Sequence, residues 1–218
     1  MANGDWGVEI SGGYFDEKRH CYRNSKGTIV PSTTQVFSIL GCNDFDGVPQ
    51  DVLEWKRVYG TAVHRAIEYL VAGDLDWDSL DEVIIPAVSG LEQKLKALQF
   101  KYEAAEEMRV HNLFGMQYGL TVDLKGTIVH QGKERKAVID LKSGVKFSPT
   151  WRWQVGGYTS AQGKVDGGWM GVILQFDKEG IVHPHYIDLL PAQREFQILL
   201  SAAILKLNNG LAKIGKAA

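Results

Sequence analysis

The chain has 218 residues, enough to bury a hydrophobic core in one domain without disulfides or structural metals. Its formal net charge of −2 does not by itself predict a nucleic-acid partner. The two cysteines, Cys21 and Cys42, stand outside any Cys-x-x-Cys or Cys/His cluster, which disfavours a disulfide scaffold, a zinc finger and an iron–sulfur site. We therefore expect a protein of a reducing, cytoplasmic compartment.

Residues 1–13 lack the basic-then-apolar pattern of a signal peptide, and no stretch approaches the roughly 18 apolar residues of a membrane helix. We therefore expect no membrane partner. Residues 1–30 are rich in glycine and polar side chains, which predicts an irregular or short-stranded lead-in with little core. The whole chain, residues 1–218, is predicted to form one domain, in which residues 1–50 supply this lead-in and a first helix.

Three helices are predicted in the first half of the chain from apolar residues that recur at helical spacing. They cover residues 32–40, 53–70 and 83–98. Ser32 is a typical N-cap, and Gly41 and Gly73 are typical helix ends. His64 and Glu68 lie one turn apart on a single face of the second helix.

From residue 104 the pattern changes to β-structure. The predicted strands cover residues 107–113, 118–129, 136–142, 169–176 and 181–187. Two further helices are predicted over residues 151–161 and 191–207. This order of helices, meander, helix, hairpin and helix fits an α/β fold with a mixed central sheet flanked by helices better than a regular βαβ winding.

Two carboxylates and one amine are predicted to meet on neighbouring strands. Asp140 and Lys142 alternate along one strand and therefore project to the same face, and Asp123 returns beside them on the preceding strand. Mg²⁺ prefers oxygen ligands of this kind, and a lysine beside a metal can contact a phosphate or orient the attacking water. An exposed cross-strand charge cluster is the ordinary alternative for such a group.

The order of the motifs along the chain is more specific than any one of them. They are residues 60–68 (GTAVHRAIE), Glu107, Asp123, residues 139–142 (IDLK) and residues 154–158 (QVGGY). This order resembles the RecB-like branch of the PD-(D/E)XK nuclease superfamily, whose pattern is GTxxHxxxE, an acid-bearing strand, GxxD, a DxK strand and a QxxxY helix. Gly119 stands four residues before Asp123, so the glycine spacing departs slightly from that pattern.

The resemblance implies a role for each matching residue. His64, Asp123 and Asp140 would ligate the metal, with the Leu141 carbonyl as an additional ligand, and Lys142 would be the catalytic lysine. Glu107 would be an outer or second-metal acid, while Gln154 and Tyr158 would line the site and hold DNA. Glu68 stands at the glutamate of the GTxxHxxxE motif. The implied fold is the PD-(D/E)XK, restriction-endonuclease-like core, and the implied cofactor is Mg²⁺, with Mn²⁺ able to substitute.

The segment Val30-Pro31-Ser32-Thr33-Thr34 also resembles the PSVT-type lead-in of phage-type and mitochondrial-type exonucleases, with Thr33 in place of the usual valine. The resemblance therefore implies a DNA exonuclease of recombination, repair or phage DNA processing, acting on double- or single-stranded ends. It is also compatible with a homo-oligomer or a recombination partner protein. An endonuclease of the same fold and a catalytically inactive DNA-binding protein are the alternatives.

Two further features of the sequence bear on the site. Asp123 and Lys125 form a second acid-x-lysine pair, with Glu107 upstream, and compete with Asp140 and Lys142 for the catalytic assignment. Residues 133–152 hold six basic and two acidic side chains, a net charge of +4 that could engage phosphates. Trp151 and Trp153 nearby could stack on unpaired bases, although tryptophans are more often core residues.

Overall fold

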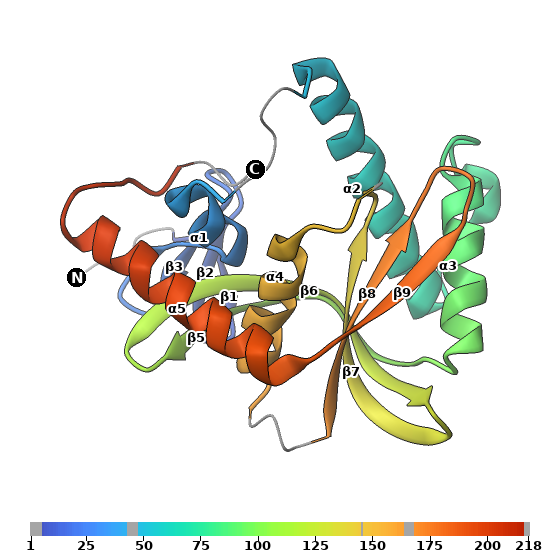
Figure 1. Cartoon of the computed structure of the whole chain (residues 1–218). Helices are drawn as coiled ribbons and strands as arrows, with labels where there is room; N and C mark the ends of the chain where they lie inside the picture. Colours follow the sequence, from blue (N-terminus) through green and yellow to red (C-terminus); the bar gives the residue numbers. More distant parts are fainter. Residues whose placement is uncertain (1–5, 43–47, 145, 164–167, 216–218) are drawn as a thin grey trace.

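The computed structural model describes residues 6–42, 48–144, 146–163 and 168–215. In these residues the chain forms a mixed α/β structure with two sheets and five α-helices (Figure 1). The helices are α1 (Thr33–Leu40), α2 (Gln50–Ala72), α3 (Ile85–Ala97), α4 (Pro149–Ser160) and α5 (Leu189–Asn208), with one 3₁₀ turn, η1 (Trp77–Ser79). The strands are β1 (Val8–Ile10), β2 (Gly13–Asp16), β3 (Cys21–Asn24), β4 (Ile29–Val30), β5 (Lys101–Leu113), β6 (Met116–His130), β7 (Lys133–Lys142), β8 (Trp169–Phe176) and β9 (Val182–Ile187). All five predicted helices and all five predicted strands are confirmed; β5 begins six residues before its predicted start, and the other ends move by at most three residues.

The larger sheet has the strand order β5-β6-β7-β8-β9. All of its pairs are antiparallel except β7 with β8, which are parallel and are connected through α4. A parallel pair needs a crossover connection, and α4 supplies it. The predicted mixed central sheet is therefore confirmed.

Helices cover both faces of this sheet. One core cluster joins the sheet to α2 and α3 through residues such as Ile67, Leu91 and Ile139. The other joins it to α1, α4 and α5 and includes Tyr118 and Phe196. Each face of the sheet thus has its own apolar layer, as an α/β sandwich requires.

The first 30 residues build more structure than their composition predicts. Strands β1 to β4 form a small antiparallel sheet in sequence order, which packs against β5 and β6. Phe15, Tyr22 and Val30 are buried in a cluster with Val110 of β5. The expectation of little core is therefore wrong, because a few aromatic and branched side chains suffice once β5 supplies the opposite surface.

Helix α2 begins three residues before its predicted start and ends at Gly73, as predicted. Its first turns project past the rest of the molecule (Figure 1). Trp55 and Val58 are consequently exposed, by 50% and 55%, although both belong to the apolar stripe of the sequence. None of the described helices is both long enough and apolar enough to span a bilayer.

The sheet divides at the point where the predicted site lies. The ladder between β6 and β7 ends with the pair Leu124 and Ile139. Beyond this pair, the start of β6 continues beside β5, whereas the end of β7 continues beside β8. Figure 1 shows β5 and β6 running toward the small sheet while β7 to β9 run alongside α2. We refer to the position where β6 and β7 separate as the fork.

Candidate metal and hydrolytic site

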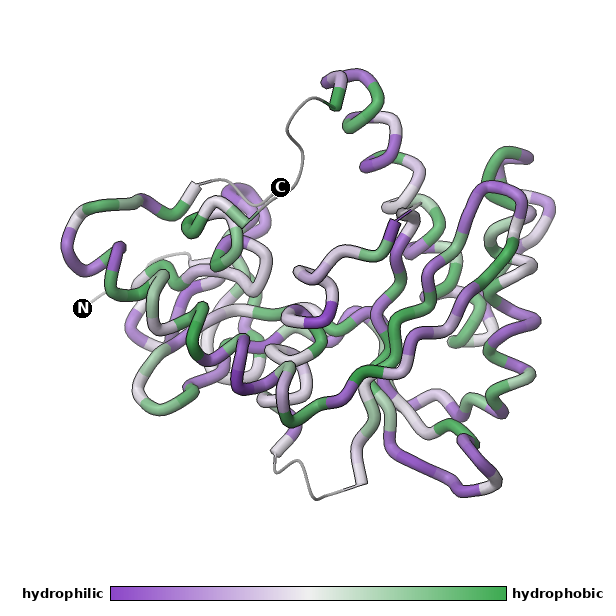
Figure 2. Tube along the Cα trace, in the orientation of Figure 1, coloured by the Kyte–Doolittle hydropathy of each residue, from purple (hydrophilic) through white to green (hydrophobic). Residues whose placement is uncertain are grey.

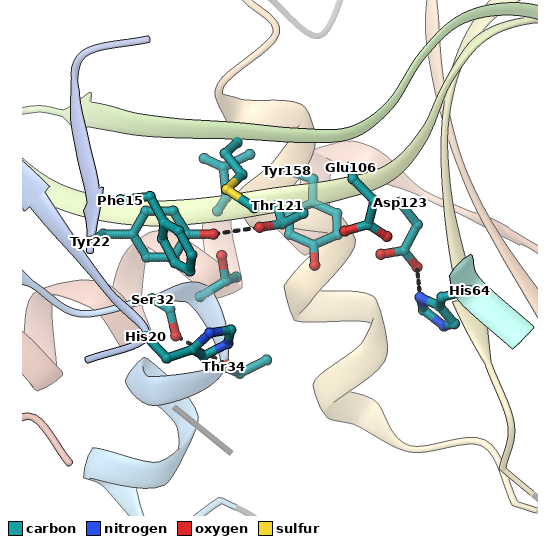
Figure 3. A pocket seen from close by; sticks show the side chains of 13 residues that line it. Phe15, His20, Tyr22, Ser32, Thr34, His64, Glu106, Thr121, Asp123 and Tyr158 are labelled. Carbon is teal, nitrogen blue, oxygen red and sulfur yellow. Dashed lines mark hydrogen bonds and ion pairs between the residues drawn. The ribbon is translucent and has the colours of Figure 1, made fainter. Parts of the chain in front are cut away.

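Three potential metal ligands converge at the fork. They are the imidazole of His64 from α2, the carboxylate of Glu106 from β5 and the carboxylate of Asp123 from β6. One ligand atom of each lies within 4.8 Å of the others. In Figure 3 the three side chains point toward one another beside Tyr158. Three elements supply this single cluster, and His64 lies more than forty residues before the two acids in sequence.

Asp123 supplies a hydrogen-bond acceptor to the backbone where β6 and β7 separate and no longer pair with each other. Its Oδ2 accepts a 2.7 Å hydrogen bond from the backbone N–H of Leu141. The same oxygen lies 3.6 Å from Nδ1 of His64. A buried backbone N–H must find a partner, so the aspartate at this point stabilises the separation of the strands as well as facing the cluster.

His64 contacts the same peptide from the other side. Its Nε2 lies 3.0 Å from the carbonyl oxygen of Leu141, and because a carbonyl only accepts, the ring nitrogen donates. The expected ligand oxygen of Leu141 thus lies at hydrogen-bonding distance from the expected ligand His64.

The acid that β5 contributes is Glu106, one residue before the expected Glu107. Ala105 pairs with Leu124 and Glu107 with Val122, which places Glu106 opposite Asp123. Glu106 has a φ of 48°, in the left-handed region that non-glycine residues seldom adopt. Such strained backbone costs about 1–3 kcal/mol and clusters at functional sites.

Glu107 is engaged elsewhere. Its Oε1 accepts a 3.0 Å hydrogen bond from Arg109, and its Oε2 lies 3.5 Å from Nζ of Lys125. The structure thus brings Glu106, and not Glu107, to the cluster. The adjacent pair Glu106-Glu107 signals an acid at this point of the strand, but only the strand register and the left-handed residue decide which one faces Asp123.

Asp140 lies near the end of β7, beside the fork and outside the cluster of three potential ligands. It is completely buried, its Oδ1 accepts a 3.0 Å bond from Nζ of Lys142, and its Oδ2 is buried without a hydrogen-bond partner among the described residues. Burial raises the pKa of Asp140 to about 7, with the Asp123 carboxylate adding to the rise and Lys142 opposing it. A buried carboxylate oxygen with no partner is costly unless something binds it.

Glu106 shares this electrostatic environment. Burial raises its pKa to about 8, and the negative charges of Asp123 and Glu68 add to the effect. Several carboxylates held close together in a buried site are stabilised in their charged form by a divalent cation. Oxygen donors predominate in the set, which suits Mg²⁺ or Mn²⁺, so the residues fit the implied metal.

Gln154 and Tyr158 lie one turn apart on α4 and are both buried at the site. The side-chain amide of Gln154 donates a short hydrogen bond to the Tyr158 hydroxyl oxygen. Burial raises the pKa of Tyr158 well above its usual value, and the nearby Asp140 and Asp123 carboxylates add to this shift. The tyrosine therefore stays protonated, and its own hydrogen can be donated to an acceptor in the pocket beside Asp123.

The structure separates the two candidate lysines. Lys142 points from the fork into a wide groove along α2 and contacts Asp140. Lys125 lies 2.8 Å from Glu103 and 3.5 Å from Glu107, and its side chain is 13% exposed. Its amine is therefore held in an ion-pair network, which supports the choice of Asp140 and Lys142.

Two hollows meet at His64, Glu106 and Met108. The narrower, about 250 Å³, runs under the small sheet; its other lining residues include Phe15, His20, Tyr22, Ser32, Thr34 and Thr121 (Figure 3). The wider groove, about 950 Å³, follows α2; its charged lining residues include Glu17, Lys56, Arg57, Arg65, Glu68 and Lys142. The cluster is thus open to solvent from the groove and continues into a more confined pocket.

The basic window at residues 133–152 does not form one patch. Lys133, Arg135 and Lys136 lie at the start of β7, in a hairpin tip that is hydrophilic in Figure 2. Along β7, Lys133 lies nine residues and Lys136 six residues before Lys142, about 30 Å and about 20 Å at the usual rise. Lys142, in the middle of the window, lines the groove at the site, whereas Arg152 at its end pairs with Glu195 of α5.

Both tryptophans of the window pack against the fold. Trp153 donates a 2.7 Å hydrogen bond to Glu195 of α5, and its ring lies against Phe37. Trp151 packs in the cluster of Val155 and Ile173. Their placement favours the core interpretation over a base-stacking platform.

The sequence matches no protein-family model and no curated protein. The fold is similar to the crystal structure of a "Putative exonuclease" from Eubacterium rectale, with a TM-score of 0.51 over 84% of this chain and 83% of that chain, at 9% identity. The crystal structure of SSO0001 covers 84% of this chain and 85% of its own at 17% identity, but its TM-score of 0.31 supports no argument. What the comparisons show is the fold: the chain shares the mixed α/β architecture of the Eubacterium rectale protein.

Proposed function

We propose that the protein is a metal-dependent deoxyribonuclease that hydrolyses DNA from its ends. The convergence of His64, Glu106 and Asp123 at the fork, with Asp140 and Lys142 on the adjoining branch, is the observation that carries this proposal. The fold shared with the "Putative exonuclease" supports it, as does the motif order that resembles the RecB-like branch of the PD-(D/E)XK nucleases. Recombination, repair or phage DNA processing is the corresponding role.

The residues present divide into those that would hold a cation and those that would hold substrate. His64, Asp123, Asp140 and the Leu141 carbonyl would bind Mg²⁺ or Mn²⁺, with Glu106 as the further acid. When bound, the cation supplies a water of lowered pKa and offsets negative charge on the phosphate. Among the described residues, Oδ2 of Asp140 and Oε2 of Glu107 are the buried carboxylate oxygens without a hydrogen-bond partner, and a cation held by Asp140 would account for the first.

Lys142, Tyr158 and Gln154 would act on the substrate. The amine of Lys142, fixed by Asp140, would contact the scissile phosphate or orient the attacking water. Tyr158 would donate to a phosphate or sugar oxygen, because Gln154 already occupies its hydroxyl oxygen as a donor. No covalent intermediate is required in this scheme.

Preference for DNA ends is supported by the shape of the cavity. The wide groove leads to the cluster from one side, whereas the small sheet and the start of α1 line the narrow pocket on the other. A strand that enters along α2 would therefore meet a confined space just beyond the cluster, and a terminal nucleotide fits such a space better than a continuous strand.

The test is degradation of linear and circular DNA, single- and double-stranded, with Mg²⁺, with Mn²⁺ and with EDTA. We expect metal-dependent loss of end-labelled linear DNA, intact circular DNA and no activity in EDTA. Asp140→Asn is the inactive control. Cleavage of circular single strands would favour an endonuclease, and binding without hydrolysis on every substrate would favour a DNA-binding protein.

A further inference from the structure

Strand β8 carries one polar side chain in an otherwise apolar run, and that residue lies beside the lysine of the site. Gln175 is in register with Lys142 on the parallel neighbour β7, so the two side chains leave the same face of the sheet. Gln175 is only 9% exposed. A buried amide next to the proposed catalytic lysine needs partners for both of its ends.

Both ends of this amide are occupied, and their orientation follows from the partners. The amide nitrogen donates a 2.6 Å hydrogen bond to the carbonyl oxygen of Gly144, which can only accept. The amide oxygen therefore faces Nε2 of His185 at 2.8 Å, and that nitrogen must carry the hydrogen. Burial lowers the pKa of His185, with His183 adding to the shift, which is consistent with a neutral ring.

The hydrogen bond from Gln175 holds the Gly144 peptide, near the start of the loop that leads from Lys142 to α4. Gly144 packs so closely on Trp151 that an added Cβ would lie 2.4 Å from the indole ring. Further along the loop, the Phe147 ring lies 4.9 Å from His185 and 5.6 Å from Trp151. His185 thus contacts the loop directly at Phe147 and, through Gln175, at Gly144.

We propose that Gln175 and His185 are positioning residues that fix the exit of β7 and thereby the direction of the Lys142 amine. Only Ser143 separates Gly144 from Lys142, so movement of the Gly144 peptide changes the backbone that carries the lysine. The proposal rests on the proposed function in so far as Lys142 acts on the scissile phosphate. Neither Gln175 nor His185 lines the two hollows that meet at the cluster, so both act through the loop.

The principal variant is Gln175→Glu, which keeps the shape and the acceptor for His185 but replaces the donor to Gly144 with a carboxylate. His185→Ala removes the other partner, and Tyr186→Ala, at an exposed position on the same strand whose ring lies against His130, is the control. We expect the first two variants to lower kcat about tenfold or more with KM within about threefold, because small displacements of a reacting group are costly. Tyr186→Ala should leave both constants unchanged.

The decisive comparison repeats Gln175→Glu in a Lys142→Ala background. If the amide acts through Lys142, the second substitution should change the residual rate by less than about twofold, whereas an independent structural defect would lower it by the same factor as in wild type. An equal factor in both backgrounds would overturn the inference. Wild-type kcat in Gln175→Glu would do the same.

The hydrogen-bonded link from His185 through Gln175 to Gly144 is called the tether below. Hydrogen exchange tests this tether without reference to activity. In Gln175→Glu, peptides that contain Gly144 and Phe147 should exchange faster, while peptides of α2 and α3 should not change. Unchanged exchange around Gly144 would refute the tether even in an active enzyme. If exchange rises in Gln175→Glu as expected but the wild-type protein hydrolyses no DNA, the proposed function is refuted. The role of the tether in positioning a catalytic lysine is then refuted with it.

Discussion

Glu106 lies directly across from Asp123 on the neighbouring strand, and a carboxylate oxygen of each comes within 4.8 Å of the other and of the His64 ring. This relationship depends on a left-handed backbone at Glu106. It makes Glu106, rather than Glu107, the acid of β5 that completes the cluster.

The two adjacent glutamates form a matched pair of variants. Glu106→Gln should weaken Mn²⁺ binding, measured by calorimetry, by about tenfold or more, the range found when a group that supports a metal site is removed. Glu107→Gln should leave Mn²⁺ affinity within about threefold and act on stability instead, because Glu107 contacts Arg109 and Lys125. Loss of Mn²⁺ binding in the Glu107 variant alone would restore the original assignment.

The two lysines give a second matched pair. Lys142→Ala should lower kcat by about 10²-fold or more, as removal of a proton-transferring or phosphate-positioning group does, and leave the circular dichroism spectrum unchanged. Lys125→Ala should keep most of the activity but destabilise the fold by about 1–3 kcal/mol, because it leaves Glu103 and Glu107 without their partner. Abolished cleavage in the Lys125 variant with normal cleavage in the Lys142 variant would reverse the assignment.

The raised pKa of Glu106 predicts how stability of the metal-free protein changes with pH. The folded protein retains a proton on this carboxyl up to about pH 8, whereas the unfolded chain releases it near 4.5. Between about pH 4.5 and about pH 8 the unfolded state therefore binds fewer protons than the folded state. The free energy of unfolding consequently falls as pH rises through this interval. Asp140, with a pKa raised to about 7, changes stability in the same direction.

Glu106→Gln separates this effect from other titrations, because the amide does not ionise. In EDTA, the variant should gain thermal stability relative to wild type between about pH 5 and about pH 8.5. Thermal midpoints of both proteins at the two pH values provide the measurement. A difference between variant and wild type that does not change with pH would contradict the prediction.

Gly119 is required by the small sheet rather than by the metal cluster. A Cβ at this position would lie 2.0 Å from Cγ of the Tyr22 ring, whose hydroxyl is hydrogen-bonded to Thr121. Gly119→Ala should therefore cost about 1–3 kcal/mol in denaturant unfolding, as overpacking of a core does. Gly215→Ala, with no atom within 4 Å of the added methyl, is the control and should cost far less.

Most of the fold follows from local pattern. The strand over residues 169–176 and the cap of α1 at Ser32 were predicted at the observed positions, because period-two and period-3.6 spacing and capping chemistry are local properties. The small N-terminal sheet was not, since Phe15 and Tyr22 become a core only against Val110, almost ninety residues away.

The types and order of the candidate site residues can be read from local sequence: a histidine on a helix, acids on neighbouring strands, an acid-x-lysine strand end and a glutamine–tyrosine helix. Tertiary structure decided which members meet. The end of the β6–β7 ladder after Leu124 and Ile139 turns Asp123 toward the Leu141 peptide, and the left-handed residue in β5 selects Glu106 over Glu107. Strand register and backbone handedness arise from contacts between distant segments, and no local spacing encodes them.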